Sequence, residues 1–142
     1  MARAYAKRLS ADLILIDKRR PKPNQAEVMN IIGNVRDRNI LIVDDLIDTG
    51  GTFCNAVTAL KEAGAKEIFG ACTHPLLSGN SVDRLAQSAV SKLFVTDTIG
   101  LNAKSKSLKK LEILSVDRIF AEAIKRGFTN KSISSLFDID KG

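Results

Sequence analysis

The sequence predicts one α/β domain in which a parallel sheet carries helices on both faces. Apolar segments suited to strands alternate along the chain with segments whose apolar residues recur at helical spacing. The chain has 142 residues, 44% of them hydrophobic, which is enough for a single buried core. Because no internal repeat and no linker divides it, we interpret residues 1–142 as one domain.

The first elements surround a basic segment. "ARAYAKRL" is typical of a short amphipathic helix, and "DLILI" at residues 12–16 predicts a buried strand. Residues 17–27 contain two of the three prolines and four cations, which predicts a mobile basic loop. Residues 28–32, "VMNII", predict a strand that ends at Gly33 and Asn34.

The middle of the chain predicts a strand, a turn and a helix in direct succession. "NILIVDD", residues 39–45, is almost continuously apolar before its acids, as expected of a strand covered on both faces. After two glycines, apolar residues recur on one helical face, and Gly64 is suited to end that helix. The residues of this face are Phe53, Ala56, Val57 and Leu60.

The alternation continues to the end of the chain, as βαβ units require. Strands are expected at residues 67–73, 92–97 and 111–116, and helices at residues 81–88 and 118–127. Residues 102–110, "NAKSKSLKK", are biased toward lysine and serine, and we expect a solvated surface loop there. In such a sheet, ligands bind beyond the carboxyl ends of the strands.

Composition excludes several classes of protein. No apolar run approaches the roughly 20 residues that span a bilayer, and the first ten residues lack the apolar stretch of a secretion signal. We therefore expect a cytoplasmic protein that does not bind a membrane. Cys54 and Cys72 are too far apart for a CxxC motif and are expected to be thiols in the core. The net charge of +6 is compatible with an anionic partner but does not identify it.

One stretch, "ILIVDDLIDTGGTF" at residues 40–53, places three acids, two glycines and two threonines directly after an apolar strand. The first N–H groups of a helix lack intrahelical acceptors and carry partial positive charge, so they can bind phosphate. Glycines let the backbone approach the anion, and threonine hydroxyls add donors. Because three carboxylates would repel phosphate alone, the ligand must also offer hydroxyl donors or a metal ion, as a ribose phosphate does. The predicted substrate-binding residues are Asp44, Asp45, Asp48, Thr49, Gly50, Gly51 and Thr52.

Other interpretations of this stretch are weaker. Asp, Thr and Gly are common at helix N-caps and in turns, but an N-cap needs a single acid. A Walker phosphate loop is excluded because no GK[ST] stands at the required spacing, and a dinucleotide fingerprint is excluded because GxGxxG is absent. A binding site for a phosphorylated sugar is therefore favoured over a simple cap.

The same stretch resembles a known family. "VDDLIDTGGT" looks like the phosphoribosyl-diphosphate loop of type I phosphoribosyltransferase folds. Together with "DKRRPKPNQAEVMNIIGNV", "CTHPLLSGNSVDRL", "VTDTI" and "SISSLF", it resembles ribose-phosphate diphosphokinase, also called phosphoribosyl diphosphate synthetase, over nearly the whole chain. The resemblance is to the C-terminal part of a family with two domains of this fold. It implies an N-terminally truncated domain that lacks its own first strand and the whole N-terminal domain.

The resemblance implies a reaction and its components. The family transfers the terminal diphosphoryl group of ATP, with Mg²⁺, to C1 of ribose 5-phosphate, which gives phosphoribosyl diphosphate for nucleotide biosynthesis and AMP. Lys18 and Arg20 match the cations of the family's flexible catalytic loop, and we expect them to be catalytic. No metal ligand is assigned in this chain, and His74 is expected to have a structural or subunit-contact role. Since the family's adenine-binding surface lies largely in the missing part, the fragment alone is expected to have little or no activity.

Regulation and assembly follow from the resemblance as well. Ser132, Ser134 and Phe137 match a family segment near a regulatory nucleotide and phosphate site between subunits. The full-length family forms homo-oligomers, commonly hexamers. The alternative function is a non-catalytic module that binds phosphoribosyl compounds or nucleotides and regulates a full-length synthetase. A nucleic-acid-binding domain is disfavoured, because only 5% of the residues are aromatic.

Overall fold

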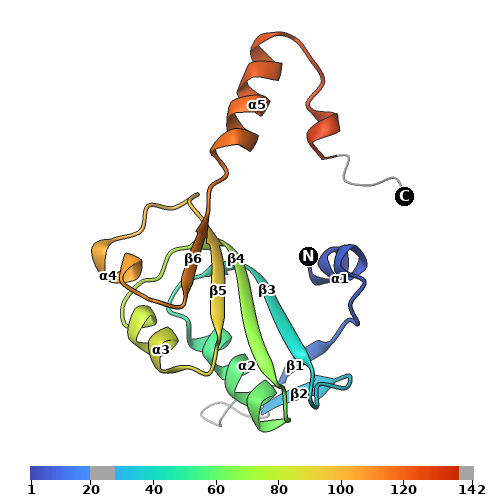
Figure 1. Ribbon diagram of the computed structural model, residues 1–142, viewed down its shortest axis with the longest axis vertical. Coiled ribbons are helices and arrows are strands. Elements are labelled where there is room, and N and C mark those ends of the chain that lie inside the picture. Colours follow the sequence, from blue (N-terminus) through green and yellow to red (C-terminus); the bar gives the residue numbers. More distant parts are fainter. Residues whose placement is uncertain (20–27, 138–142) are drawn as a thin grey trace.

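The structure is a computed structural model that describes residues 1–19 and 28–137. Figure 1 shows how its helices and strands are arranged. In chain order the elements are α1 (Ala2–Leu9), β1 (Leu15–Arg19), β2 (Val28–Ile32), β3 (Asn39–Ile47), α2 (Gly51–Glu62), β4 (Glu67–Pro75), α3 (Ser81–Gln87), β5 (Lys92–Thr96), α4 (Ala103–Lys106), β6 (Leu111–Leu114), α5 (Asp117–Phe128) and the 3-10 turn η1 (Ser134–Leu136).

The main sheet contains four parallel strands in the order β3-β4-β5-β6. Its register places Ile40 opposite Ile68 and Val95 opposite Cys72. Each strand is joined to the next by a helical connection, as parallel pairing requires. The predicted α/β class with a parallel sheet is confirmed.

One face of this sheet forms the core together with α2 and α3. The largest fully buried side chains include Leu60, Ile68, Leu85 and Leu93. Burying each such side chain stabilises the fold by about 1.5–3 kcal/mol. The four residues that we predicted as the apolar face of the helix are all buried in α2, and Cys72 belongs to the same core.

Helix α2 ends as its sequence predicts. Gly64 adopts φ +92°, a left-handed conformation that glycine accepts without strain. The N–H of Ala65 donates to the carbonyl of Leu60, and the N–H of Gly64 donates to the carbonyl of Lys61. These two bonds form a Schellman motif, which satisfies carbonyls that the last turn would otherwise leave unpaired.

The first predicted strand differs from the observed one. The strand begins at Leu15 rather than at residue 12, and it pairs antiparallel with β2 in a separate two-stranded ribbon. Leu15 is 54% exposed, so the strand is not buried as predicted. An apolar run indicates a strand but does not indicate which sheet will pair with it, and a two-stranded ribbon covers little of its own surface.

Residues 102–110 also differ from the expected loop. They contain the short helix α4, whose N-cap Asn102 accepts a hydrogen bond from the N–H of Ser105 at 2.8 Å. Ser105 and Leu108 are buried, which anchors this segment against the core. Lys104, Lys106 and Lys109 are exposed as the composition suggested, whereas Lys110 is half-buried and its Nζ donates to the carbonyls of Ala86 and Ser88.

Two helices lie outside the core that α2 and α3 build. Helix α1 lies beside β3, where a cavity of about 600 Å³ is lined by α1 and by side chains that include Leu41, Val43 and Phe69. Helix α5 follows β6 and projects away from the sheet (Figure 1). Its apolar side chains are largely uncovered, since Ile124 is 70% and Phe128 90% exposed. Among the described residues, no helix is long and apolar enough to cross a membrane.

Candidate functional site

The predicted ligand-binding stretch lies where β3 passes into α2. The strand extends to Ile47, two residues beyond the expected end at residue 45, so Asp44 and Asp45 lie within the strand rather than at its end. The strand keeps pairing with β4 at Leu46 and Ile47, which explains the extra length. In a parallel sheet the carboxyl ends of neighbouring strands share one edge, which is where such folds bind ligands.

Gly50 makes the turn between the strand and the helix. It is the N-cap of α2 with φ +73° and ψ 0°, a left-handed conformation that only glycine adopts readily. The first intrahelical bond runs from the N–H of Cys54 to the carbonyl of Gly50 at 2.9 Å. The N–H groups of Gly51, Thr52 and Phe53 precede that bond and have no acceptor within the helix. Because no side chain caps α2, these groups are available to an anion.

The three acids differ in environment. Asp44 is half-buried, and burial raises the pKa of its carboxyl group above the ordinary value of 3.8. Its Oδ1 accepts the N–H of Asp45 at 3.0 Å. Asp45 and Asp48 are exposed. A carboxylate that is partly removed from water is stabilised by any donor that reaches it, such as a sugar hydroxyl.

The turn rests on residues 77–84, which we call the support segment. The N–H groups of Leu77 and Ser78 donate to the carbonyls of Ile47 and Asp48, each at 3.1 Å. The hydroxyl of Ser78 donates to Oδ1 of Asp48. Sequence reasoning missed these contacts, since they join residues that are 30 positions apart and no local pattern marks them.

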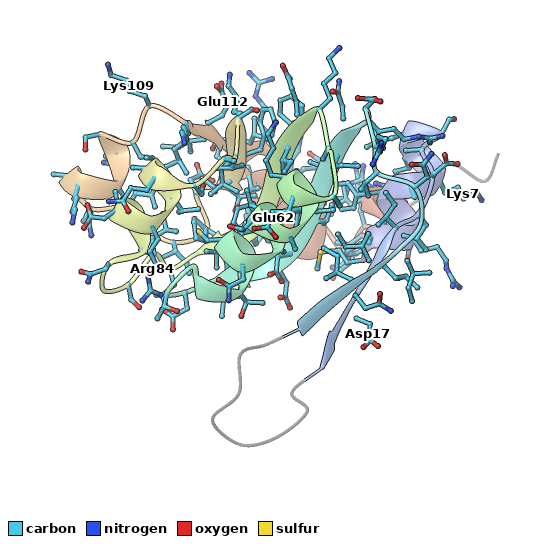
Figure 2. The ribbon with its side chains drawn as sticks, turned by 90° about the horizontal axis from the view of Figure 1, so that it is seen from below. Lys7, Asp17, Glu62, Arg84, Lys109 and Glu112 are labelled. Carbon is cyan, nitrogen blue, oxygen red and sulfur yellow. The ribbon has the colours of Figure 1, made fainter. Side chains whose placement is uncertain are left out.

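Arg84 reaches the turn from α3. Its Nη1 donates to the carbonyl of Thr49 at 3.3 Å. Arg84 is labelled in Figure 2, and this bond places its positive charge beside the carbonyl of Thr49. Next to the turn, a polar cavity of about 490 Å³ lies between α2 and α3. Its lining residues include Gly51, Cys54 and Arg84.

Polar side chains also gather at the ends of the next strands. Nδ1 of His74, at the end of β4, lies 3.0 Å from Oγ1 of Thr98. The carboxylate of Asp97, after β5, accepts the hydroxyl of Ser115 and the N–H of Val116, and these bonds lower the pKa of Asp97. His74 is exposed, and its expected structural or subunit-contact role stays a prediction.

The predicted catalytic cations are placed only in part. Lys18 belongs to β1, where its backbone pairs with Met29. Arg20 lies outside the described residues, as does most of the basic segment. The structure therefore brings neither cation into a described contact with the turn, and their role stays a prediction.

The predicted regulatory residues lie beyond α5. The carbonyl of Ser132 accepts from Nη1 of Arg126 at 3.1 Å, and the hydroxyl of Ser132 accepts the N–H of Ser134 at 3.1 Å. Phe137 is 75% exposed. These residues form a local turn after the projecting helix, and their regulatory role also stays a prediction.

Besides burial, the carboxyl group of Asp45 raises the pKa of Asp44, so these two acids lie close together. Within residues 1–19 and 28–137, no three His, Cys, Asp or Glu side chains are grouped so that they could hold a metal ion. Mg²⁺ in phosphoryl-transfer sites is usually held by one or two carboxylates together with substrate phosphates. The carboxylates of Asp44, Asp45 and Asp48 are of the chemical kind that could share such an ion with substrate phosphates.

The sequence is similar to known proteins over nearly the whole chain. Residues 2–138 match the family described as phosphoribosyl synthetase-associated domain. The chain is 53% identical over 137 residues to the ribose-phosphate pyrophosphokinase of Coxiella burnetii (strain RSA 493 / Nine Mile phase I). It is 50% identical over 137 residues to the protein of the same description from Bacillus caldolyticus. Both alignments cover 96% of this chain but only 43% of the relative.

A solved structure has the same arrangement of elements. The phosphoribosylpyrophosphate synthetase from Mycobacterium smegmatis superposes with a TM-score of 0.81 at 31% sequence identity. The superposition covers 91% of this chain and 42% of that protein. The chain thus spans less than half the length of the relatives that it matches.

Proposed function

The chain belongs to the phosphoribosyl synthetase-associated domain family, and from this premise and the geometry of its turn we propose that it is part of a ribose-phosphate diphosphokinase. The proposed reaction transfers diphosphate from ATP to C1 of ribose 5-phosphate. The observation that carries the proposal is the junction of β3 and α2, where acids stand beside a glycine turn with free helical N–H groups.

In this proposal the turn binds the acceptor substrate. The 5-phosphate binds to the N–H groups at the start of α2 and to the hydroxyls of Thr49 and Thr52, which are all hydrogen-bond donors. The glycines of the turn have no Cβ that would block the anion from the backbone. The carboxylates of Asp44 and Asp45 accept hydrogen bonds from the ribose hydroxyls. Binding at both ends would fix the sugar and direct its C1 hydroxyl toward the diphosphoryl donor.

The transfer itself requires charge neutralisation on the phosphoryl oxygens. Lys18 and Arg20 would supply cationic groups, since a lysine point charge and a guanidinium fork both bind phosphate oxygens. When bound together with ATP, Mg²⁺ would neutralise part of the phosphate charge. We also propose that ATP and Mg²⁺ take part in the reaction and that its product is phosphoribosyl diphosphate. The full-length protein would be a homo-oligomer in the cytoplasm.

The second candidate is a non-catalytic module that binds the same ligands and regulates a full-length synthetase. We consider it because the chain covers 43% of the length of a relative, and the activity in that relative's name is that of the whole protein. Both candidates predict that the turn binds ribose 5-phosphate, and they differ in whether the chain takes part in turnover.

Two measurements test the proposal. Calorimetric titration of the 142-residue chain with ribose 5-phosphate should show binding that Asp44→Asn weakens and that inorganic phosphate inhibits competitively. AMP formation should then be measured for the chain alone and for the chain mixed with the separately produced remainder of a close relative. We expect little turnover alone and measurable turnover in the mixture. Absence of ribose 5-phosphate binding would overturn the proposed function, and binding with no turnover in the mixture would favour the regulatory module.

A further inference from the structure

The turn that carries the ligand-binding residues is held by the support segment. Three consecutive carbonyl groups, those of Ile47, Asp48 and Thr49, accept hydrogen bonds from the support segment. Their donors are the N–H of Leu77, the N–H of Ser78 and the guanidinium of Arg84. The support segment therefore fixes the direction of three successive peptide groups.

Because the peptide bond is planar, the direction of each carbonyl also fixes the direction of the N–H group that follows it. In a trans peptide the C=O of one residue and the N–H of the next point in opposite directions. When the carbonyls of residues 47–49 point toward the support segment, the N–H groups of residues 48–50 point away from it. Successive N–H groups that face the same way form a concave anion-binding surface. The support segment thus directs these N–H groups to the side on which the phosphate would bind.

Asp48 is tied to the same support. Its carboxylate accepts the hydroxyl of Ser78, while its carbonyl accepts the N–H of the same residue at 3.1 Å. Of the three acids, Asp48 is nearest in sequence to the phosphate-binding glycines, and a free carboxylate there would repel the anion. The bond to Ser78 directs the carboxylate toward the support segment.

We propose that Ser78 and Arg84 are positioning residues for the phosphate-binding turn: Ser78 orients Asp48, and Arg84 orients the peptide that follows Thr49. Neither residue touches the ligand in this proposal, and both act through the turn. The inference rests on the proposed function, because it assigns these residues to the binding of the phosphate of ribose 5-phosphate.

The chain offers a matched control on the same segment. Ser81 is fully buried beside Gly50, and its hydroxyl has no hydrogen-bond partner within the described part of the chain. Ser78→Ala and Ser81→Ala each remove one hydroxyl from the support segment, but only the first removes a bond to the turn. Ser78→Thr keeps the hydroxyl and should restore binding. Arg84→Lys keeps the charge but loses the guanidinium, whereas Arg84→Met loses both.

The experiment measures ribose 5-phosphate affinity by calorimetry, together with the thermal midpoint and the amide chemical shifts of each variant. We expect Ser78→Ala to weaken binding roughly tenfold, the size of effect that losing one hydrogen bond to a carboxylate produces. Ser81→Ala and Ser78→Thr should bind within about twofold of wild type. In the absence of ligand, Ser78→Ala should shift the amides of residues 48–50 while leaving the amides of α5 unchanged. Arg84→Met should weaken binding more than Arg84→Lys does.

The outcomes separate this inference from the function on which it rests. If wild type binds ribose 5-phosphate and Ser78→Ala binds it equally well, the positioning role is wrong while the proposed function stands. If Ser81→Ala weakens binding as much as Ser78→Ala, the effect is one of general packing, and the positioning role is also wrong. If wild type does not bind at all, the proposed function fails, and the inference fails with it.

Discussion

Gly50 gives the sharpest test of the turn, because its backbone and its surroundings impose different limits on substitution. An added Cβ would lie 3.7 Å from the nearest heavy atom, Cβ of Ser81, which is ordinary van der Waals contact. The φ of +73° is the obstacle, since a side chain in the left-handed region costs about 1–2 kcal/mol. Alanine also has fewer conformations than glycine in the unfolded chain, which offsets this cost by about 0.4–1 kcal/mol. Gly50→Ala should therefore destabilise the fold by about 1 kcal/mol, a shift of about 3–4 °C in thermal midpoint.

The measurement is urea unfolding followed by circular dichroism, with Gly100→Ala as the matched control. Gly100 does not have a positive φ, and an added Cβ there meets no heavy atom within 4 Å among the described residues. Gly50→Asn should lose less stability than Gly50→Ala, because asparagine tolerates the left-handed region. If Gly50→Ala and Gly100→Ala unfold at the same urea concentration, the strain argument for the turn is wrong.

Four further results are expected. Gly70→Ala should cost about 1–3 kcal/mol in urea unfolding, since its Cβ would lie 2.6 Å from side-chain atoms of both Leu93 and Phe53. The pKa of Asp97 is lowered, so its contribution to stability is present above the ordinary value of 3.8 and is lost as pH falls through its folded-state pKa. Asp97→Asn should therefore destabilise the fold at pH 7, and this difference in the free energy of unfolding should shrink as the pH is lowered below 3.8. Asp44 has a raised pKa, so its ability to accept from ribose should fall as pH drops through a value above 3.8, and the affinity ratio of wild type to Asp44→Asn should shrink over that range. In a complete enzyme, Lys18→Ala and Arg20→Ala should each lower kcat by roughly 10²–10³ with little effect on ribose 5-phosphate affinity, and unchanged turnover would reassign both cations to the surface.

Sequence reasoning succeeded where structure is set by neighbours along the chain. The apolar run before the acids predicted β3, the 3.6-residue spacing predicted α2, and Gly64 predicted the end of that helix. Each of these features depends on residues within about four positions of one another. The fold class followed because such units repeat along the chain and βαβ repeats have few stable arrangements.

The remaining features depend on contacts between segments that are separated in the sequence. Residues 12–16 were apolar enough for a buried strand, yet the pairing of β1 with β2 left Leu15 in solvent. The support segment could not be predicted, because Ser78 and Arg84 approach the turn only after β4 and α3 have packed. One missed element did carry a local signal, since Asn102 stands three residues before Ser105 as an N-cap does, and lysine-rich composition was given more weight than that signal.

The central claim is that the turn between β3 and α2 binds ribose 5-phosphate. The most direct test is a titration of the isotope-labelled chain with ribose 5-phosphate, followed by amide chemical shifts. The account predicts that the amides of residues 48–52 move most and saturate together, and that Asp44→Asn raises the concentration needed for saturation. If only amides remote from this turn respond, such as those of α1 or α5, the turn is not the ribose 5-phosphate site.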